Sequence, residues 1–395
     1  MEYRISDKLA SLKPSAIREI FKSLTNPEII AFAAGNPAAE SFPTEFIQQK
    51  AAQILREKPV TALQYSITEG YPELRAAVKK RLSEAFGIDG GDDEVIITSG
   101  GQQGLELVCK VMCNEGDVVI AEDPSFIGAL NGFRSNGAKV VGVEMESDGM
   151  NVGKLEKALR DNPKAKLIYI IPTFHNPMGI TTSEEKRREI YRLAKKYGVI
   201  ILEDNPYGEL RFGGTDVPTI KSMDTDGIVA YCGSYSKVLS SGMRIGFLCA
   251  PKEIISKAVV AKQVEDVHTN ILCQMICESF VTSEFYLPHL EKIRELYRRK
   301  CGLMLDGIKN CFPENVEYTS PEGGLFVWCT LPPAAELGEF VASALNEKVA
   351  VVPGTAFNCD VDAPSRSFRL NYSTPSDEQI VRGTEILGKI LRKYR

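Results

Sequence analysis

The amino-acid sequence predicts an α/β protein with a large, mainly parallel seven-stranded sheet covered by helices, plus a smaller α+β domain. Three observations predict this fold class. From about residue 95, short β-branched runs that are apolar throughout indicate strands covered on both faces. Helix-length segments lie between most of these runs, and such strand–helix–strand repetition favours parallel pairing. After about residue 284 the pattern changes to a long charged helix followed by short strands and helices.

Seven apolar runs are the strand candidates of the large sheet. Between them, the segment 183–197 shows how a helix is predicted: Ser183, Glu184 and Lys186 form a polar first turn before the apolar residues begin. The strand candidates are Val95–Thr98, Val118–Ala121, Lys139–Val143, Leu167–Ile171, Val199–Glu203, Ile228–Cys232 and Ile245–Cys249.

Two domains are expected. The first 45 residues hold one short predicted helix, Ser15–Ser23, and the loop-forming GNPAAESFP, which is too little for a separate domain. We therefore expect a large domain over residues 46–283, and a small domain made of residues 284–395 together with 1–45. The elements expected after residue 284 are a helix over Glu284–Cys311, strands over Val316–Tyr318, Phe326–Thr330, Val349–Val352 and Phe368–Tyr372, a helix near Ala335–Lys348 and a final helix from Ser376.

Composition excludes several classes of protein. A chain of 395 residues with 44% hydrophobic content can bury a large core, and its net charge of −5 is more acidic than a general nucleic-acid binder would be. The N-terminus lacks the apolar block of a secretory signal, and no apolar stretch approaches the ~20 residues of a membrane helix. The ten cysteines include no C-x-x-C pair. We expect a cytoplasmic protein with reduced thiols and no metal, membrane or nucleic-acid partner.

A glycine-rich turn follows the first predicted strand of the large sheet. The run Ser99-Gly100-Gly101-Gln102-Gln103-Gly104 opens a helix, where backbone N–H groups and the positive helix end can bind a phosphate or another anion. The run matches neither G-x-x-x-x-G-K-[ST] nor G-x-G-x-x-G. A tight strand-to-helix turn that needs glycine explains it equally well.

A lysine flanked by hydroxyl groups follows another predicted strand. Lys237 ends the run GSYSK, and Arg244 comes seven residues later. The carboxyl end of a central strand is where α/β sheets bind ligands, and desolvation beside a cation lowers the pKa of a lysine enough for it to attack a carbonyl. Ser234, Ser236 and Arg244 then suit a phosphate on the same ligand. Taken alone, a lysine such as Lys237 is most often a surface residue.

Polar side chains follow other strands of the sheet. Asp204 comes directly after the strand Val199–Glu203, and a buried aspartate needs a cationic partner, so it either caps its loop or holds a protonated ring nitrogen. Asn176 and Tyr207 could both donate to one phenolate oxygen. Phe126 could lie flat on a ring, although an ordinary core phenylalanine is commoner.

A phosphate cradle, an aldehyde-capturing lysine, a pyridinium carboxylate and phenolate donors together describe the needs of pyridoxal phosphate. The motifs GGQQ, DPSF, HNPMG, DNPYG, SYSK with MRIG, and SFRLNYS closely resemble, in this order, the class I/II aminotransferases of fold-type I pyridoxal phosphate-dependent enzymes. PSAIREIFK resembles the N-terminal helix of 2-aminoadipate and related broad-specificity aminotransferases. The resemblance implies a homodimer with shared active sites that moves an amino group from an L-amino acid to a 2-oxo acid, with 2-oxoglutarate as the expected acceptor.

The resemblance also implies roles around the cofactor. Lys237 would form the internal aldimine and later move the proton between Cα and C4′. Asp204 would hold the pyridine nitrogen, Asn176 and Tyr207 the ring oxygen, and Phe126 would cover the ring face. The residues around the phosphate would be Gly101, Gln102, Ser234, Ser236 and Arg244, with Tyr65 reaching it from the partner subunit.

Four residues are implied to contact the substrate. Arg369 in SFRLNYS would bind the α-carboxylate, a task suited to its bidentate fork. Gly35 in AAGNP would belong to the loop that closes over the substrate, and Asn176 would lie beside it. Arg18 is the candidate for binding an acidic side chain, although it could simply face solvent on a helix.

Two other functions remain open at this point. A C–S β-lyase acting on cysteine conjugates would use the same cofactor residues, and release of pyruvate and ammonia without an added oxo acid would distinguish it. An effector-sensing domain of a transcription regulator would require a winged-helix domain, for which the segment before AFAAGNP is too short. The amino donor, the pathway and any assembly above a dimer are not fixed by the sequence.

Overall fold

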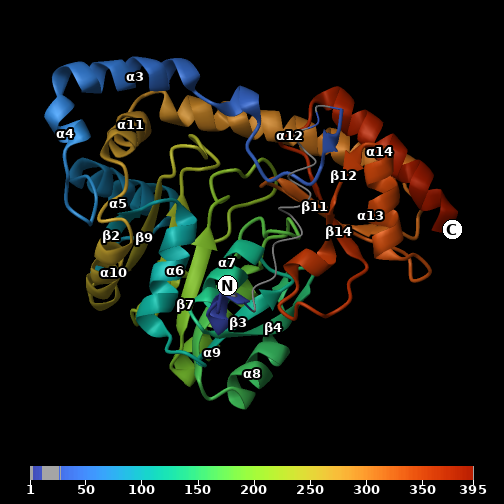
Figure 1. Cartoon of the computed structure of the whole chain (residues 1–395), viewed down its shortest axis with the longest axis horizontal. Coiled ribbons are helices and arrows are strands. Elements are labelled where there is room, and N and C mark those ends of the chain that lie inside the picture. Colours follow the sequence, from blue (N-terminus) through green and yellow to red (C-terminus); the bar gives the residue numbers. More distant parts are fainter. Residues whose placement is uncertain (1–2, 11–25, 27, 395) are drawn as a thin grey trace.

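An eight-stranded sheet forms the centre of the larger part of the molecule (Figure 1). The structure is a computed structural model and describes residues 3–10, 26 and 28–394. Five neighbouring strands are parallel, while β9 runs antiparallel to both of its neighbours and β5 closes one edge as a hairpin. All seven predicted strands are present. In spatial order the strands are β2 (Asp93–Thr98), β9 (Gly246–Pro251), β8 (Val229–Ser234), β7 (Ile200–Asn205), β6 (Ala165–Ile170), β3 (Val118–Asp123), β4 (Lys139–Glu146) and β5 (Gly149–Met150).

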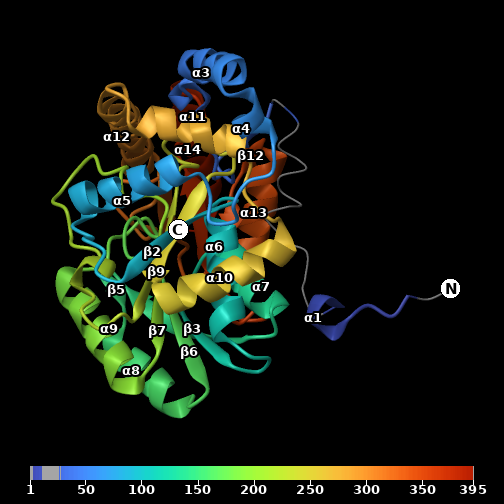
Figure 2. The same ribbon diagram turned by 90° about the vertical axis from the view of Figure 1, so that its left-hand side faces the viewer.

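Helices cover both faces of this sheet (Figure 2), which is why its strands are apolar at successive positions. On β3, Val119 and Ala121 pack into one core cluster, whereas Val118 and Ile120 pack into another on the opposite face. The covering helices are α6 (Gly101–Met112), α7 (Ile127–Ser135) and α10 (Lys252–Glu265) on the first face, and α8 (Val152–Asp161) and α9 (Glu184–Tyr197) on the second.

The helix predicted over residues 183–197 shows how local sequence sets an element's ends. The Ser183 side chain accepts a hydrogen bond from the Lys186 N–H and caps the first turn. Gly198 ends α9 with a φ of 66°, a left-handed conformation that glycine adopts without steric cost. The predicted helix is therefore confirmed.

A four-stranded antiparallel sheet organises the C-terminal part of the chain. The single predicted strand Val349–Val352 is wrong, because the chain changes sheet at Val351: β12 pairs with β1 near the N-terminus, whereas β13 pairs with β14. The other predicted elements are present with small shifts of their ends. The elements are β1 (Ile30–Ala31), α12 (Tyr286–Cys311), β10 (Glu317–Tyr318), β11 (Phe326–Thr330), α13 (Leu337–Asn346), β12 (Val349–Ala350), β13 (Val352–Pro353), β14 (Ser367–Asn371) and α14 (Asp377–Leu391).

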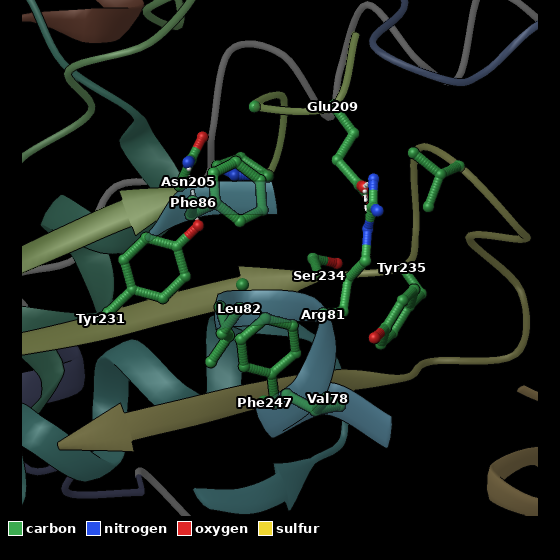
Figure 3. A pocket seen from close by; sticks show the side chains of 14 residues that line it. Val78, Arg81, Leu82, Phe86, Asn205, Glu209, Tyr231, Ser234, Tyr235 and Phe247 are labelled. Carbon is green, nitrogen blue, oxygen red and sulfur yellow. Dashed lines mark hydrogen bonds and ion pairs between the residues drawn. The ribbon is translucent and has the colours of Figure 1, made fainter. Parts of the chain in front are cut away.

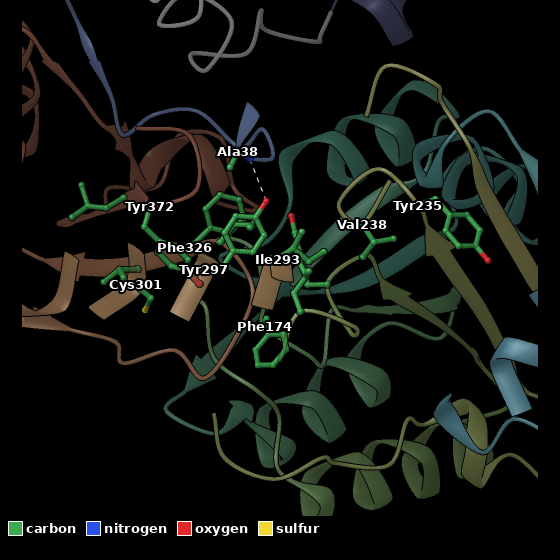
Figure 4. Packing of buried hydrophobic residues seen from close by; sticks show 14 of the residues in the cluster. Ala38, Phe174, Tyr235, Val238, Ile293, Tyr297, Cys301, Phe326 and Tyr372 are labelled. Atoms are coloured by element: carbon green, nitrogen blue, oxygen red, sulfur yellow. Dashed lines mark hydrogen bonds between the residues drawn. The ribbon is translucent and has the colours of Figure 1, made fainter. Parts of the chain in front are cut away.

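One large apolar cluster joins the C-terminal elements to the loops above the main sheet. It contains Phe174 and Val238 from those loops together with Ile293 of α12 and Tyr372 (Figure 4). The hydroxyl of Tyr297 in the same cluster accepts a hydrogen bond from the Ala38 N–H at 3.2 Å. The N-terminal loop is thereby held beside the C-terminal elements.

The other helices include α3 (Thr44–Glu57), α4 (Pro59–Leu63), α5 (Pro72–Phe86) and α11 (Ile271–Val281), which pack against one another, and α1 (Asp7–Ala10), which lies beside α7. No helix in the described part of the chain is long and apolar enough to cross a membrane. The predicted helix Ser15–Ser23 lies outside the described residues.

Candidate active site

A cavity of about 470 Å³ lies where the carboxyl ends of β7 and β8 meet the N-terminus of α6. This is the edge at which α/β sheets bind ligands. The loop after β1 and the strands β11 and β14 complete its walls. Of the predicted site residues that the structure describes, the cavity brings together all but Tyr65: Gly35, Gly101, Gln102, Phe126, Asn176, Asp204, Tyr207, Ser234, Ser236, Lys237, Arg244 and Arg369.

Lys237 projects into this cavity from the turn after β8. Its Nζ donates to the Gly35 carbonyl at 2.8 Å, and it forms no ion pair within the described part of the chain. Burial, followed by the charges of Arg369 and Arg244, lowers the pKa of Lys237 to about 8. A substantial fraction of this amine is therefore neutral near pH 7, as a nucleophile or a base requires.

The N-terminus of α6 forms an anion cradle with two serines and Arg244. Gly100 has a φ of 81°, and a β-carbon there would overlap the Arg244 guanidinium, so the close approach requires glycine. Arg244 donates to the Ser236 hydroxyl and to the Ser99 carbonyl at 3.4 Å each, which are long hydrogen bonds. The Ser234 hydroxyl accepts from the Ser236 N–H at 3.1 Å. These groups keep donors available for an anion beside the positive helix end.

Gln102 and Phe126 lie on the wall formed by α6 and α7. The Gln102 side chain donates to the Gly128 carbonyl and to Glu106, both at 2.9 Å, so it points toward α7. Phe126 precedes the first residue of α7, and its ring covers Gly128, where a β-carbon would collide with it. Gln102 can therefore offer an anion only its backbone N–H, and Phe126 presents an aromatic side chain to the cavity.

Asp204 lies at the end of β7 and is 5% exposed. Tyr169 on β6 donates its hydroxyl to Asp204 Oδ2 at 2.8 Å. Burial, and to a smaller extent the charge of Glu122, raises the pKa of Asp204 to about 7, although the bond from Tyr169 opposes the shift. A carboxylate in this state gains strongly from a cationic N–H partner. Tyr169 was not predicted; its signal was a polar hydroxyl within the apolar run Leu167–Ile171.

A second buried acid, Glu122, lies at the end of β3. Glu122 Oε2 accepts from the Ile171 N–H at 2.7 Å and lies 3.2 Å from His175 Nε2. His175 Nδ1 accepts from the Met178 N–H at 3.3 Å, which leaves the imidazole proton on Nε2, facing Glu122. Sequence reasoning missed Glu122, whose signal was an acidic residue directly after an apolar strand. Its charge adds to the negative potential around Asp204.

Arg369 on β14 is a buried cation with spare hydrogen-bonding capacity. It is 4% exposed, donates to Asn176 Oδ1 at 2.9 Å and to the Ala33 and Ala34 carbonyls at 3.0 and 3.1 Å, and lies over the Phe326 ring. Its Nε has no partner, and no carboxylate pairs with it among the described residues. Burial lowers the pKa of Arg369 to about 10. The cavity therefore contains an uncompensated guanidinium, which favours an anionic ligand.

Tyr207 and Gly35 complete the wall around Arg369. Burial raises the pKa of the Tyr207 phenol above its usual value, against the charge of Arg369 and a hydrogen bond with the Asn176 side chain. The Gly35 carbonyl accepts the hydrogen bond from Lys237. A loop residue from the N-terminal segment thus lies against both Lys237 and the Arg369 side of the cavity.

Among the described residues, Tyr65 is a predicted site residue that does not line the cavity. Tyr65 follows α4, is 82% exposed, and has its ring centroid 6.0 Å from that of His268. Arg18 lies outside the described residues. Within the described ranges, no group of three or more His, Cys, Asp or Glu residues is placed to hold a metal ion.

A smaller cavity lies on the other side of β8 (Figure 3). It shares Ser234 with the first cavity and also contains an arginine, Arg81. Arg81 forms an ion pair with Glu209, and Asn205 donates to the Tyr231 hydroxyl at 2.9 Å. The cation in this cavity already has its counter-charge.

Comparisons with known proteins cover nearly the whole chain. A family model described as aminotransferase class I and II matches residues 27–387. An aromatic-amino-acid aminotransferase of Thermococcus litoralis is 37% identical over 396 residues, covering 99% of this chain and 95% of that protein. A 2-aminoadipate transaminase of Thermus thermophilus is 39% identical over 385 residues, covering 96% and 94%. The solved structure of the alpha-aminoadipate aminotransferase LysN from Thermus thermophilus, complexed with N-(5'-phosphopyridoxyl)-L-leucine, matches with a TM-score of 0.90 at 37% identity, covering 98% and 97%.

Proposed function

The chain belongs to the class I and II aminotransferases and is a pyridoxal phosphate-dependent enzyme of fold type I, and from this premise we propose how its residues divide the reaction. When bound, pyridoxal 5′-phosphate supplies an aldehyde that captures amines and a ring that accepts electrons from Cα. Three features of the cavity suit this group: a glycine-dependent anion cradle, a lysine with no ion pair among the described residues, and a buried carboxyl group.

Lys237 is the proposed catalytic residue. Its position after β8 directs the Nζ into the cavity, where a pKa of about 8 makes the amine available to bind the cofactor's aldehyde carbon. The same Nζ, once released, is the base proposed to move the proton between the substrate Cα and the cofactor C4′. Arg369 and Arg244 support both tasks, because their charges disfavour the protonated amine.

Asp204 is proposed to keep the pyridine nitrogen protonated. The Tyr169 hydroxyl fixes one carboxylate oxygen, and the cationic N–H of the ring would provide the partner that Asp204 lacks. Asn176 and Tyr207 are proposed to donate to the ring oxygen, and Phe126 to cover the ring face. Gly101, Gln102, Ser234, Ser236 and Arg244 are proposed to bind the phosphate, Gln102 through its backbone.

Arg369 is proposed to bind the α-carboxylate of every substrate. The single observation that carries this role is a buried guanidinium with an unpartnered Nε and no carboxylate among the described residues. A planar carboxylate matches its fork. Asn176 and Gly35 would line the same subsite, since Asn176 orients Arg369 and Gly35 adjoins it.

The proposed donors are L-amino acids with large side chains, and the proposed acceptor is 2-oxoglutarate. Leu105, Ile127 and Phe326 give the cavity an apolar lining, which suits long or aromatic side chains. Arg18 is proposed to bind a second carboxylate, so Arg18→Ala should lower kcat/KM for glutamate or 2-aminoadipate while sparing leucine.

The test is a panel of amino acids with 2-oxoglutarate, following glutamate formation and the absorbance of the bound cofactor. Transamination predicts stoichiometric glutamate and oxo-acid product. Release of pyruvate and ammonia from a cysteine conjugate without an oxo acid would instead indicate a β-lyase. If Arg18→Ala changes acidic and apolar substrates equally, the acidic preference loses its basis.

The active form is proposed to be a homodimer in which Tyr65 reaches the neighbour's phosphate. Tyr65 is exposed, as are Val60 and Leu63 of the preceding helix α4, and neighbouring exposed apolar side chains favour association. Mixing and reassembling Tyr65→Ala with Lys237→Ala should restore activity, because one hybrid site then holds both intact residues. A fully active monomer in sedimentation at assay concentration would overturn this arrangement.

Residues 46–283 are proposed to form the cofactor-binding domain, and residues 284–395 with 1–45 the small domain. The pairing of β1 with β12 supports grouping the N-terminal segment with the C-terminal part. A role in amino acid metabolism, including biosynthesis, in the cytoplasm is also proposed, since the ten cysteines are free thiols that suit a reducing compartment. Cell fractionation would test the location.

A further inference from the structure

A buried lysine that the reaction does not use lies behind the glycine-rich turn. Lys262 on α10 is 0% exposed, and its Nζ donates to Gln103 Oε1 at 2.8 Å, to both Asp266 oxygens at 2.8 and 2.9 Å, and to Thr269 Oγ1 at 3.0 Å. Replacing buried ion pairs by apolar residues is often neutral or stabilising, so their presence is weak evidence of a role in stability alone. The contacts of this cluster therefore indicate which other role it has.

The Lys262 cluster holds Ser99, the residue before the glycines of the turn. The Ser99 N–H donates to Gln103 Oε1 at 2.8 Å, the same oxygen that accepts from Lys262. The Ser99 hydroxyl donates to Asp266 at 2.6 Å. The Ser99 carbonyl accepts from Arg244 at 3.4 Å. Every polar group of Ser99 is thus tied either to the cluster or to Arg244.

The same cluster extends toward the segment that carries Tyr65. The Thr269 carbonyl accepts from Gln274 Nε2, and Gln274 Oε1 accepts from the Tyr71 N–H, both at 2.7 Å. Next to Thr269, the ring of His268 meets the ring of Tyr65 edge-on. One hydrogen-bonded unit therefore connects the start of α6 with residues 65–71.

Charges within the unit are balanced. Hydrogen bonds from Lys262, Ser99 and Gln103 lower the pKa of Asp266, although desolvation by burial opposes them. Burial lowers the pKa of Lys262, while Asp266 opposes that shift. Loss of the lysine would leave Asp266, Gln103 and Thr269 without a shared donor in a partly or fully buried place.

We propose that Lys262 is a positioning residue for the cofactor phosphate: it fixes Ser99, and through Ser99 the N–H groups of Gly101 and Gln102 at the start of α6. The proposal rests on the proposed placement of the phosphate in this cradle. Lys262 touches neither the cavity nor Lys237 in the described structure, so it acts only through the turn.

The test compares two ligands that differ only in the phosphate. Lys262→Met keeps the length of the side chain and removes the donor. Its dissociation constant for pyridoxal 5′-phosphate should rise about 10- to 100-fold, by analogy with the loss seen when groups that orient metal ligands are removed. The constant for phosphate-free pyridoxal should stay within about twofold, and kcat at saturating cofactor should change little.

Three further variants make the result interpretable. Lys300→Met removes another fully buried lysine, one that donates to the Pro375 carbonyl at 2.6 Å, and should leave the ratio of the two affinities unchanged. Ser99→Ala breaks the link to Asp266 without stranding a buried charge, so it should show a smaller loss in the same direction. Arg244→Met tests the cradle itself and should weaken only the phosphate-bearing ligand.

The outcomes separate the two proposals. If Arg244→Met weakens pyridoxal 5′-phosphate selectively while Lys262→Met and Ser99→Ala do not, the cradle stands and the positioning role of Lys262 is wrong. If none of these variants weakens pyridoxal 5′-phosphate more than pyridoxal, the proposed placement of the phosphate is wrong. An equal loss for both ligands in folded Lys262→Met would show general damage to the site and would also refute the positioning role. If Lys262→Met does not fold, Ser99→Ala decides.

Discussion

Two cavities on opposite sides of β8 share Ser234 and both contain arginine, Arg81 in the smaller and Arg244 and Arg369 in the larger, yet only the larger is organised to bind an anion. In the smaller cavity Arg81 pairs with Glu209, and Glu209 also accepts from the Tyr286 hydroxyl. In the larger cavity the hydrogen bonds of Arg369 within the described chain go to carbonyl and amide oxygens, and its Nε keeps no partner there. A buried cation without a counter-charge favours the binding of an anionic ligand. An arginine that already pairs with a carboxylate of the protein attracts such a ligand much less.

A lysine in the cavity and a lysine behind the glycine-rich turn show the same contrast. Lys262 has four hydrogen bonds, two of them to the Asp266 carboxylate, and is fixed. Lys237 has one bond to a carbonyl and two arginines that disfavour its charged form. The reactive lysine is therefore the one whose amine has a single hydrogen bond and no carboxylate partner among the described residues.

The largest effect is expected at Lys237. Lys237→Ala removes both the covalent attachment point and the base, so kcat should fall by at least about 10⁴-fold, the upper range of general acid–base catalysis. Cofactor should still bind non-covalently, because the phosphate and ring contacts remain. Steady-state kinetics and the absorbance of the purified variant check this, with Lys300→Met as the buried-lysine control. Turnover within tenfold of the unmodified enzyme would contradict the role.

The two arginines give the direct test of the comparison between cavities. Arg369→Met should reduce kcat/KM for every amino acid, by about 2–5 kcal/mol in transition-state binding, because the α-carboxylate loses a buried partner. Arg81→Met should change kcat/KM by less than about threefold while lowering the melting temperature, since its ion pair serves packing. Equal reductions of kcat/KM in the two variants would contradict the proposal that only the arginine without a carboxylate partner binds the substrate.

Much of this site could be predicted because the relevant residues follow strands, and parallel strands bring their carboxyl ends to one edge. Asp204, Ser234 and Lys237 are found by that rule together with the family resemblance. Glu122 also follows an apolar run and could have been found by that rule. Tyr169 and Lys262 could not, because their contacts depend on strand register and on how α10 packs against α6.

The fold shows the same limit. The seven strands follow from their apolar runs, but the split of Val349–Val352 depends on pairing partners distant in the chain, which periodicity does not report. Tyr65 stays a prediction for a physical reason as well: a residue proposed to act in a neighbouring subunit shows only an exposed ring in a single chain.

A smaller effect is expected at Asp204, where hydrogen bonds partly survive substitution. Asp204→Asn keeps the shape but cannot hold a protonated ring nitrogen by charge, so kcat should fall about 10²-fold, as when one preorganised electrostatic contact is lost. Cofactor content should stay near that of the unmodified enzyme. Glu122→Gln, which changes only the surrounding potential, should lower kcat less. Turnover of Asp204→Asn near that of the unmodified enzyme would refute the assignment.

The smallest effect concerns pH. The neutral amine of Lys237 captures an aldehyde, and with a pKa of about 8 roughly one molecule in ten is neutral at pH 7. The rate at which cofactor-free enzyme binds pyridoxal covalently should therefore rise about tenfold as pH increases through 8 and level off above 9. Arg369→Met should move the midpoint upward, because a charge that disfavours the ammonium form is gone. A midpoint near 10.5 in the unmodified enzyme would show an ordinary lysine.

Lys237, whose amine lies in the cavity with no ion pair among the described residues, is proposed to carry the cofactor. Reduction of the cofactor-bound enzyme with borohydride fixes the cofactor to its lysine, and peptide mapping by mass spectrometry then locates it. The account predicts a phosphopyridoxyl group on Lys237 alone. Finding it on Lys262, Lys300 or any other lysine, with Lys237 unmodified, would contradict the account.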